Sequence, residues 1–143
     1  MIAFLDTSAL VKLYHEEDHT SQLQSLLAGD INNLCISAIA SIEFRSAIWK
    51  KVREKAFSVE KAEEVINLFY EDRLLFTWIN LTDELFNNAI NLIMEYGSRG
   101  LRTLDSIQLA SALTLKGENC ISITYDKQLK DHMINERLNV YDK

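Results

Sequence analysis

An aspartate lies where the chain should place an apolar residue. In "LRTLDSIQLASAL", residues 101–113, Asp105 follows Leu101 by four residues and precedes Leu109 by four. This spacing puts the carboxylate within the apolar stripe of an amphipathic helix. A charge on the face that meets the core costs free energy unless something compensates it. Asp105 therefore needs a partner, and the identity of that partner bears on what the chain does.

Three further acids raise the same question. Glu43 lies four residues after Ile39 and four before Ala47, so it also falls within an apolar helical stripe. Asp6 directly follows the apolar run "IAFL", and Asp126 comes just after "CISITY". Acids that follow two parallel strands lie at the carboxyl edge of a sheet, where ligands of α/β proteins bind.

Gathered in one place, four carboxylates would repel one another and some of them would take up protons. A divalent cation removes this repulsion, and Mg²⁺ or Mn²⁺ prefers oxygen ligands. We therefore expect Asp6, Glu43, Asp105 and Asp126 to surround one Mg²⁺ (or Mn²⁺) site.

Each acid also has a local interpretation that needs no ligand. Asp6 could cap a helix, and Asp126 could belong to a turn. Glu43 could pair with Arg45 or Arg99, and Asp105 could lie in the first turn of a helix that Thr103 caps. Any one of these is reasonable alone. All four together would require four independent coincidences, so the shared site is the favoured hypothesis.

The elements that must position these acids follow from apolar periodicity. Short apolar runs predict strands, and stretches with helical spacing separate them. The predicted strands span residues 2–5, 34–37, 75–81 and 120–124, with a last edge strand at 139–141. Strands joined by helices imply crossover connections. We predict an α/β sandwich with a central, mostly parallel sheet of about five strands and helices on both faces.

Length and composition are typical of one globular domain. The 143 residues are 48% hydrophobic and 25% charged, with four glycines and no proline, so we expect a single domain over residues 1–143. The chain has no apolar run that approaches a membrane span and no secretion signal, and a cytoplasmic location is expected. Cys35 and Cys120 are then interpreted as buried thiols.

Charge is unevenly distributed along the chain. The net charge is −6, yet "FRSAIWKKVREK", residues 44–55, carries five basic residues and one acid. Trp49 with Arg45 and Arg53 forms either a nucleic-acid contact strip or the outer face of an ordinary amphipathic helix. Arg99 and Arg102 precede Asp105 and could contact phosphate, or belong to a simple loop. His15 and His19 have helical zinc-ligand spacing without a third ligand, and we interpret them as surface residues.

Four segments together resemble the acidic motifs of PIN-domain ribonucleases, with VapC-type toxins of type II toxin–antitoxin pairs as the nearest likeness. They are, in order, "FLDTSALVKLYHEE", "SAIASIEFRSAI", "LRTLDSIQLASAL" and "SITYDKQL", and they run from residue 4 to residue 129. Each motif alone is weak. The ordered set in a chain of this length is specific.

The resemblance implies a three-layer PIN sandwich and a Mg²⁺- or Mn²⁺-dependent endoribonuclease. Asp6, Glu43, Asp105 and Asp126 match the catalytic acids, and Ser8 and Thr124 match the hydroxyl residues that flank the first and last of them. Arg45, Arg99 and Arg102 are candidates for RNA contact. No histidine falls within the motif cores, which disfavours covalent catalysis by a serine or threonine.

The resemblance also implies partners, namely an RNA substrate, a small antitoxin protein and a second copy in a homodimer. An apolar groove near the first and fourth predicted helices suits an antitoxin helix. Its expected residues are Leu10, Leu13, Tyr14, Ile66, Phe69 and Tyr70.

Three alternatives stay open. The chain could be an RNA-processing PIN nuclease that is no toxin, or a catalytically inactive PIN-fold binding module. "LDTSAL" also suggests a haloacid-dehalogenase-like phosphohydrolase, in which the first aspartate is the nucleophile. That family needs a second aspartate two residues later, and this chain has Ser8 there.

Overall fold

A computed structural model describes residues 1–142 and contains one parallel sheet of four strands. The strands lie in the order β3 (Phe76–Ile79), β2 (Asn33–Ser37), β1 (Ile2–Leu5) and β4 (Cys120–Ile123). All three strand pairs are parallel, so the four carboxyl ends meet at one edge. The predicted α/β class and parallel sheet are confirmed.

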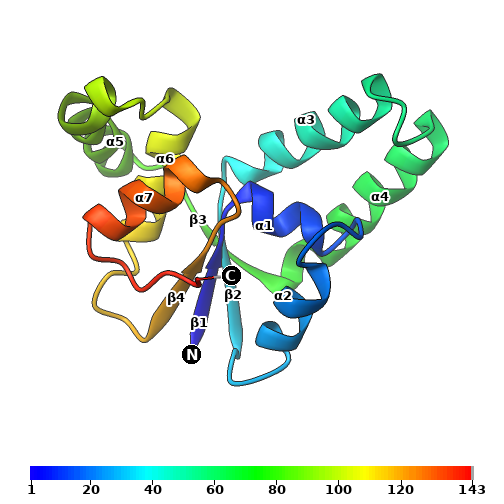
Figure 1. The fold of residues 1–143 in the computed structure, drawn as a ribbon, viewed down its shortest axis with the longest axis horizontal. Helices are drawn as coiled ribbons and strands as arrows, with labels where there is room; N and C mark the ends of the chain where they lie inside the picture. Colours follow the sequence, from blue (N-terminus) through cyan, green and yellow to red (C-terminus); the bar gives the residue numbers. More distant parts are fainter. Residues whose placement is uncertain (143) are drawn as a thin grey trace.

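The central strand is buried on both faces because helices cover both. Along β1, Ala3 and Leu5 pack into one apolar cluster, whereas Phe4 between them packs into the other. All three side chains are fully buried. This alternation follows from the two-residue period of a strand, and it makes the fold a three-layer sandwich (Figure 1).

The helices of residues 1–142 form two groups, one on each face of the sheet (Figure 1). The first group comprises α1 (Thr7–Lys12), α2 (Thr20–Leu27), α3 (Ala40–Arg53) and α4 (Val59–Glu71). The second group comprises α5 (Asp83–Tyr96), α6 (Thr103–Leu113) and α7 (Lys127–Asn135). Two short 3₁₀ helices, η1 (Asp72–Leu75) and η2 (Gly97–Arg99), complete the set. The hairpin of α3 and α4 extends well beyond the sheet (Figure 1).

The sheet has four strands where about five were predicted. The segment expected to form an edge strand at 139–141 makes one isolated parallel bridge, between Val140 and Ser122. Ser122 donates its amide to the Asn139 carbonyl and accepts from the Tyr141 amide, at 2.8 and 2.9 Å. These two hydrogen bonds hold the segment beside β4 without extending into a ladder.

The apolar residues expected to form a partner groove mostly belong to the core. Leu10 and Phe69 are buried, and Tyr14 packs edge-on against Phe69 with ring centroids 5.7 Å apart. Leu13 and Ile66 also pack against this cluster, and Tyr70 alone of the six is more than half exposed. The groove expectation is therefore wrong for five of these six residues, because they pack into the apolar cluster in which α1 and α4 each contact α3.

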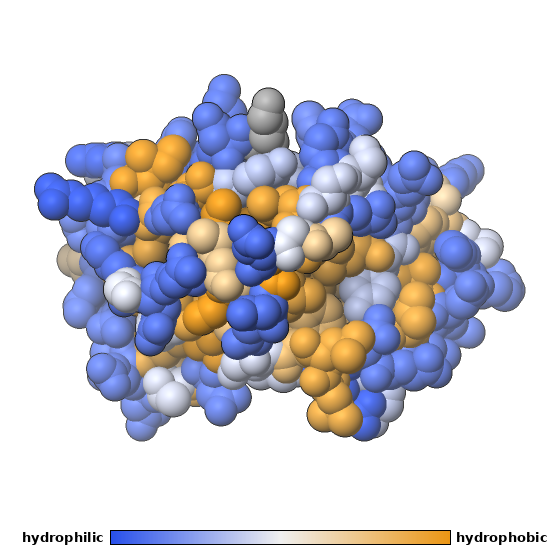
Figure 2. All heavy atoms as spheres, turned by 90° about the horizontal axis from the view of Figure 1, so that it is seen from below, coloured by the Kyte–Doolittle hydropathy of each residue, from blue (hydrophilic) through white to orange (hydrophobic). Residues whose placement is uncertain are grey.

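The face at the amino-terminal end of the strands carries patches of apolar side chains between hydrophilic ones (Figure 2). The acids that follow β1 and β4 lie at the opposite edge.

Among residues 1–142, no helix has the length and hydropathy needed to cross a membrane.

The position of Phe69 predicts a large loss of stability on truncation. Phe69→Ala removes a ring that packs 4.2 Å from Phe44, measured between ring centroids. We expect it to lower the free energy of unfolding by about 3 to 5 kcal/mol. Tyr70→Ala, at the exposed next position, should cost less than about 1 kcal/mol. Urea unfolding of both variants measures this difference, and equal losses would contradict the assignment of Phe69 to the core.

Candidate active site

Asp6 is a buried carboxylate at the carboxyl end of β1. Its Oδ1 accepts hydrogen bonds from Ser8 Oγ at 2.7 Å and from the Ala9 amide at 3.0 Å. Its Oδ2 accepts from Thr124 Oγ1 at 2.6 Å. The side chain also caps α1, so its structural interpretation is correct and coexists with its place in the pocket described below.

Burial sets the protonation of Asp6. Removal from water raises its pKa from 3.8 to about 6, although hydrogen bonds from Thr124, Ser8 and Ala9 act in the opposite direction. The negative charge of Asp126 raises the pKa further. Asp6 is therefore a site where positive charge would be stabilising near neutral pH.

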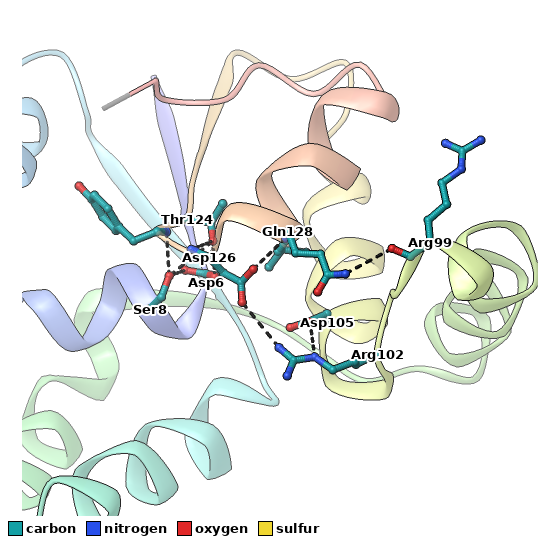
Figure 3. Close-up of polar contacts among 10 residues, drawn as sticks. Asp6, Ser8, Arg99, Arg102, Asp105, Thr124, Asp126 and Gln128 are labelled. Atoms are coloured by element: carbon teal, nitrogen blue, oxygen red, sulfur yellow. Dashed lines mark hydrogen bonds and ion pairs between the residues drawn. The ribbon is translucent and has the colours of Figure 1, made fainter. Parts of the chain in front are cut away.

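Two hydroxyls connect the ends of β1 and β4 around Asp6 (Figure 3). Ser8 Oγ accepts from the Tyr125 amide at 2.8 Å, and Thr124 Oγ1 accepts from the Asp126 amide at 3.0 Å. Both hydroxyl protons remain available for Asp6. Ser8 and Thr124 thus fix the aspartate and the backbone that leads to Asp126.

Glu43 projects from α3 and is held by two donors on one oxygen. Thr7 Oγ1 donates to Glu43 Oε1 at 2.9 Å, and Gln108 Nε2 donates to the same atom at 2.7 Å. Gln108 Nε2 also lies 3.1 Å from Thr7 Oγ1. Burial raises the pKa of Glu43, the bonds from Gln108 and Thr7 lower it, and the charge of Asp105 raises it. Because both donors use Oε1, they fix the orientation of the carboxylate.

Asp105 and Asp126 share one cation, the guanidinium of Arg102 (Figure 3). Arg102 Nε lies 3.2 Å from Asp105 Oδ2, and Nη2 lies 3.7 Å from Asp126 Oδ2. Burial raises the pKa of Asp105, as does the charge of Asp126, whereas Arg102 lowers it. Asp126 also caps α7 by accepting from the Leu129 amide at 2.9 Å. In this structure, Arg102 compensates part of the charge of Asp105.

One open pocket of about 700 Å³ is lined by all four acids. Residues of α1, α3 and α6 form its walls, and the ends of β1 and β4 contribute Asp6 and Asp126. The sequence places these acids far apart along the chain. The crossover connections of the parallel sheet bring them to one edge.

The donor set fits a hard divalent cation, because it consists of carboxylate oxygens with hydroxyls behind one of them. Within residues 1–142, however, no three His, Cys, Asp or Glu side chains are gathered tightly enough to hold a metal as they stand. The acids surround the pocket, and the Arg102 guanidinium spans two of them. Coordination would need Arg102 to release Asp105 and Asp126.

Two of the three arginines predicted to contact RNA lie elsewhere. Arg45 donates to the Ser41 carbonyl at 2.7 Å and lies over the Phe69 ring, outside the pocket lining. Arg99 packs over the Tyr96 ring and points away from the carboxylates (Figure 3). Neither arginine pairs with Glu43, so that alternative for Glu43 is wrong. Of the three arginines predicted to contact RNA, Arg102 alone lines the pocket.

Thr7, Gln108 and Lys12 also line the pocket, and residue types alone did not single them out. Gln108 lies one helical turn after Asp105, and Thr7 follows Asp6, so their proximity to predicted acids was the available signal. Lys12 is 8% exposed, donates to the Asp18 carbonyl at 2.8 Å and lies over the Tyr125 ring. Its position in the last turn of a short helix gave no indication of burial.

The raised pKa of Asp6 predicts a pH-dependent loss of stability. Its folded-state pKa of about 6 exceeds the ordinary aspartate value of 3.8, so the folded protein binds more protons than the unfolded chain between these two pH values. The free energy of unfolding should therefore fall as pH rises from about 4 to about 6, by about 3 kcal/mol from this group. Asp6→Asn should lack this fall. Urea unfolding in metal-free buffer at several pH values measures it, with Asp131→Asn as control, and parallel curves for wild type and Asp6→Asn would contradict it.

Solved structures with the same fold come from several bacteria. FitAcB of Neisseria gonorrhoeae matches with a TM-score of 0.72 and 16% identity, covering 99% of this chain and 97% of that one. A toxin–antitoxin complex of Klebsiella pneumoniae matches at 0.60 and 21%, covering 87% and 86%. VapC20 of Mycobacterium tuberculosis, a toxin that cleaves the sarcin–ricin loop, matches at 0.68 and 13%, covering 91% and 94%. At these identities the likeness shows the fold.

Sequence comparison gives the family. No curated protein matches this chain. The PIN domain profile matches residues 3–133, which include all four acids and nearly the whole described chain. The three-layer sandwich predicted from the ordered motifs is confirmed, and the chain belongs to the PIN domain family.

Proposed function

We propose that this protein is a divalent-metal-dependent endoribonuclease that acts in the cytoplasm as the toxin of a toxin–antitoxin pair. The observation that carries the proposal is the convergence of Asp6, Glu43, Asp105 and Asp126 on one pocket of a PIN domain. Four carboxylates at one edge are costly for a fold to maintain. A cation-dependent reaction on a phosphodiester gives that arrangement a use.

Asp6, Asp105 and Asp126 are the proposed metal ligands, with Glu43 as a fourth ligand or as the group that orients water. Bound Mg²⁺ or Mn²⁺ would polarise the scissile phosphate and lower the pKa of a bound water. Ser8 and Thr124 hold Asp6 in place, and Thr7 and Gln108 hold Glu43 through Oε1.

Covalent catalysis has little support in this pocket. The hydroxyls of Ser8 and Thr124 donate to Asp6, and no histidine within residues 1–142 lines the pocket to activate either. Asp6 itself is 3% exposed and accepts three hydrogen bonds, which makes it a poor nucleophile. The phosphohydrolase alternative, which needs Asp6 as its nucleophile, is therefore disfavoured.

The structural neighbours support the toxin assignment. They include a toxin–antitoxin complex and a toxin that cleaves the sarcin–ricin loop. We extend to this chain a small antitoxin partner, an RNA substrate and a homodimer. The apolar side chains available to partners differ from the groove expected from sequence, and include Leu74 and Leu75 of η1, both at least 70% exposed.

Neutralising one acid should abolish cleavage without unfolding the protein. Asp105→Asn removes a proposed ligand together with part of the repulsion among the acids, so its melting temperature in chelator should equal or exceed that of wild type. Mg²⁺ should raise the melting temperature of wild type and not that of the variant. The control Asp131→Asn removes the same charge from an exposed position of α7, outside the pocket, and should retain activity. Full cleavage in chelator, or by Asp105→Asn, would exclude the metal mechanism.

Expression in bacteria separates a toxin from the two PIN alternatives. We expect the wild-type protein alone to arrest growth, and co-expression with the adjacent small open reading frame to restore growth and yield a stable complex. Asp105→Asn should be harmless alone and still form the complex. If the protein cleaves RNA but neither arrests growth nor binds a partner, it is an RNA-processing enzyme. If it neither cleaves RNA nor arrests growth, it is an inactive binding module.

A further inference from the structure

The pocket is longer than its acidic end. From Glu43 it continues along α3 past Ser46 and Ala47 to Lys50 and Arg53. Glu43, Ala47 and Lys50 are spaced by four and three residues, so they share one face of the helix. At 1.5 Å per residue, Lys50 lies about 10 Å and Arg53 about 15 Å along the axis from Glu43. Ser46 and Ala47, which line the pocket between Glu43 and Lys50, have small side chains.

The cations at this end differ in their partners. Lys12 and Lys51 both pair with Glu17, at 3.9 and 3.4 Å, so one carboxylate compensates part of their combined charge. Lys50 and Arg53 are exposed and have no carboxylate of residues 1–142 within ion-pair distance, although Glu54 also lines the pocket. Two uncompensated cations therefore face a pocket that begins at four carboxylates.

Apolar side chains flank the acidic end itself. Ile42 of α3 is 69% exposed and Leu104 of α6 is 47% exposed, and both line the pocket beside Glu43 and Asp105. The pocket thus has exposed apolar groups beside the acids and cations without an ion pair farther along. These features suit a ligand in which flat apolar rings alternate with anionic groups. A single nucleic-acid strand has this composition.

We propose that Lys50 and Arg53 bind the phosphate backbone of the RNA strand on one side of the scissile bond, with Ile42 and Leu104 contacting the bases next to it. This inference rests on the proposed nuclease function and deepens it, since it names the residues that position the substrate. The acids act at one phosphate, and the two cations hold the strand that leads away from it. Backbone contacts of this kind position a substrate without selecting its sequence.

The test compares a double variant with a matched control. Lys50→Gln/Arg53→Gln removes the two free cations. Lys116→Gln/Arg137→Gln removes the same charges beside Cys120, at the amino-terminal end of β4 and thus at the opposite edge of the sheet. Both pairs are made in the Asp105→Asn protein, so that the RNA stays intact in Mg²⁺. Thermal melts check that both remain folded.

Binding of a short single-stranded RNA is measured by fluorescence anisotropy over a series of KCl concentrations. Loss of two phosphate contacts should reduce the slope of log Kd against log salt by about 1.4, since each contact to a single strand contributes about 0.7. The loss should be similar for RNAs of different sequence. In the otherwise wild-type enzyme, the same pair should raise KM and leave kcat nearly unchanged. The control pair should match its parent in both assays.

Failure of the RNA contact on α3 and failure of the proposed nuclease function give different results. If Lys50→Gln/Arg53→Gln and the control bind RNA with equal affinity and salt dependence while the wild type cleaves RNA, the α3 contact is wrong and the nuclease proposal stands. If the double variant lowers kcat with KM unchanged, the two cations act elsewhere than in substrate binding and the inference also fails. If no form of the protein binds or cleaves RNA, both proposals fail.

Discussion

Burial of carboxylates beside one another at one sheet edge is the cost that the rest of this site must offset. Asp6, Asp105 and Asp126 face one pocket together with Glu43. Burial raises the pKa of Asp6, Glu43 and Asp105. The protein offsets this cost with directed donors. Hydroxyls of Ser8 and Thr124 serve Asp6, and Arg102 spans the other two aspartates.

The same side chains build the fold and the site. Asp6 and Asp126 each cap a helix with one oxygen, Oδ1, and leave Oδ2 to face Thr124 and Arg102 respectively. A carboxylate that caps a helix is held in one orientation by the hydrogen bond from the helix amide. The local interpretation of Asp6 as a helix cap was therefore correct, whereas Asp126 caps α7 and does not form the turn that was expected. Capping does not compete with a role in the pocket.

Sequence alone predicted the parallel sheet and the approach of the four acids to one pocket. Both predictions rest on local signals, namely apolar runs and charges within apolar stripes. Sequence alone could not predict that Gln108 holds Glu43, since that contact joins residues 65 positions apart. Arg45 shows the opposite failure. It is next but one to Glu43 in sequence, yet helical geometry turns it toward Phe69 and away from the pocket. The partner groove failed for a related reason, because exposure depends on how α1 and α4 pack.

We propose that the four acids form one cation site, which anomalous diffraction from crystals grown with Mn²⁺ would reveal. We expect a peak among Asp6, Asp105 and Asp126, with the Arg102 guanidinium withdrawn from both carboxylates that it contacts in this structure. A peak elsewhere on the protein, or an unchanged Arg102 bridge with no peak in the pocket at saturating Mn²⁺, would contradict it.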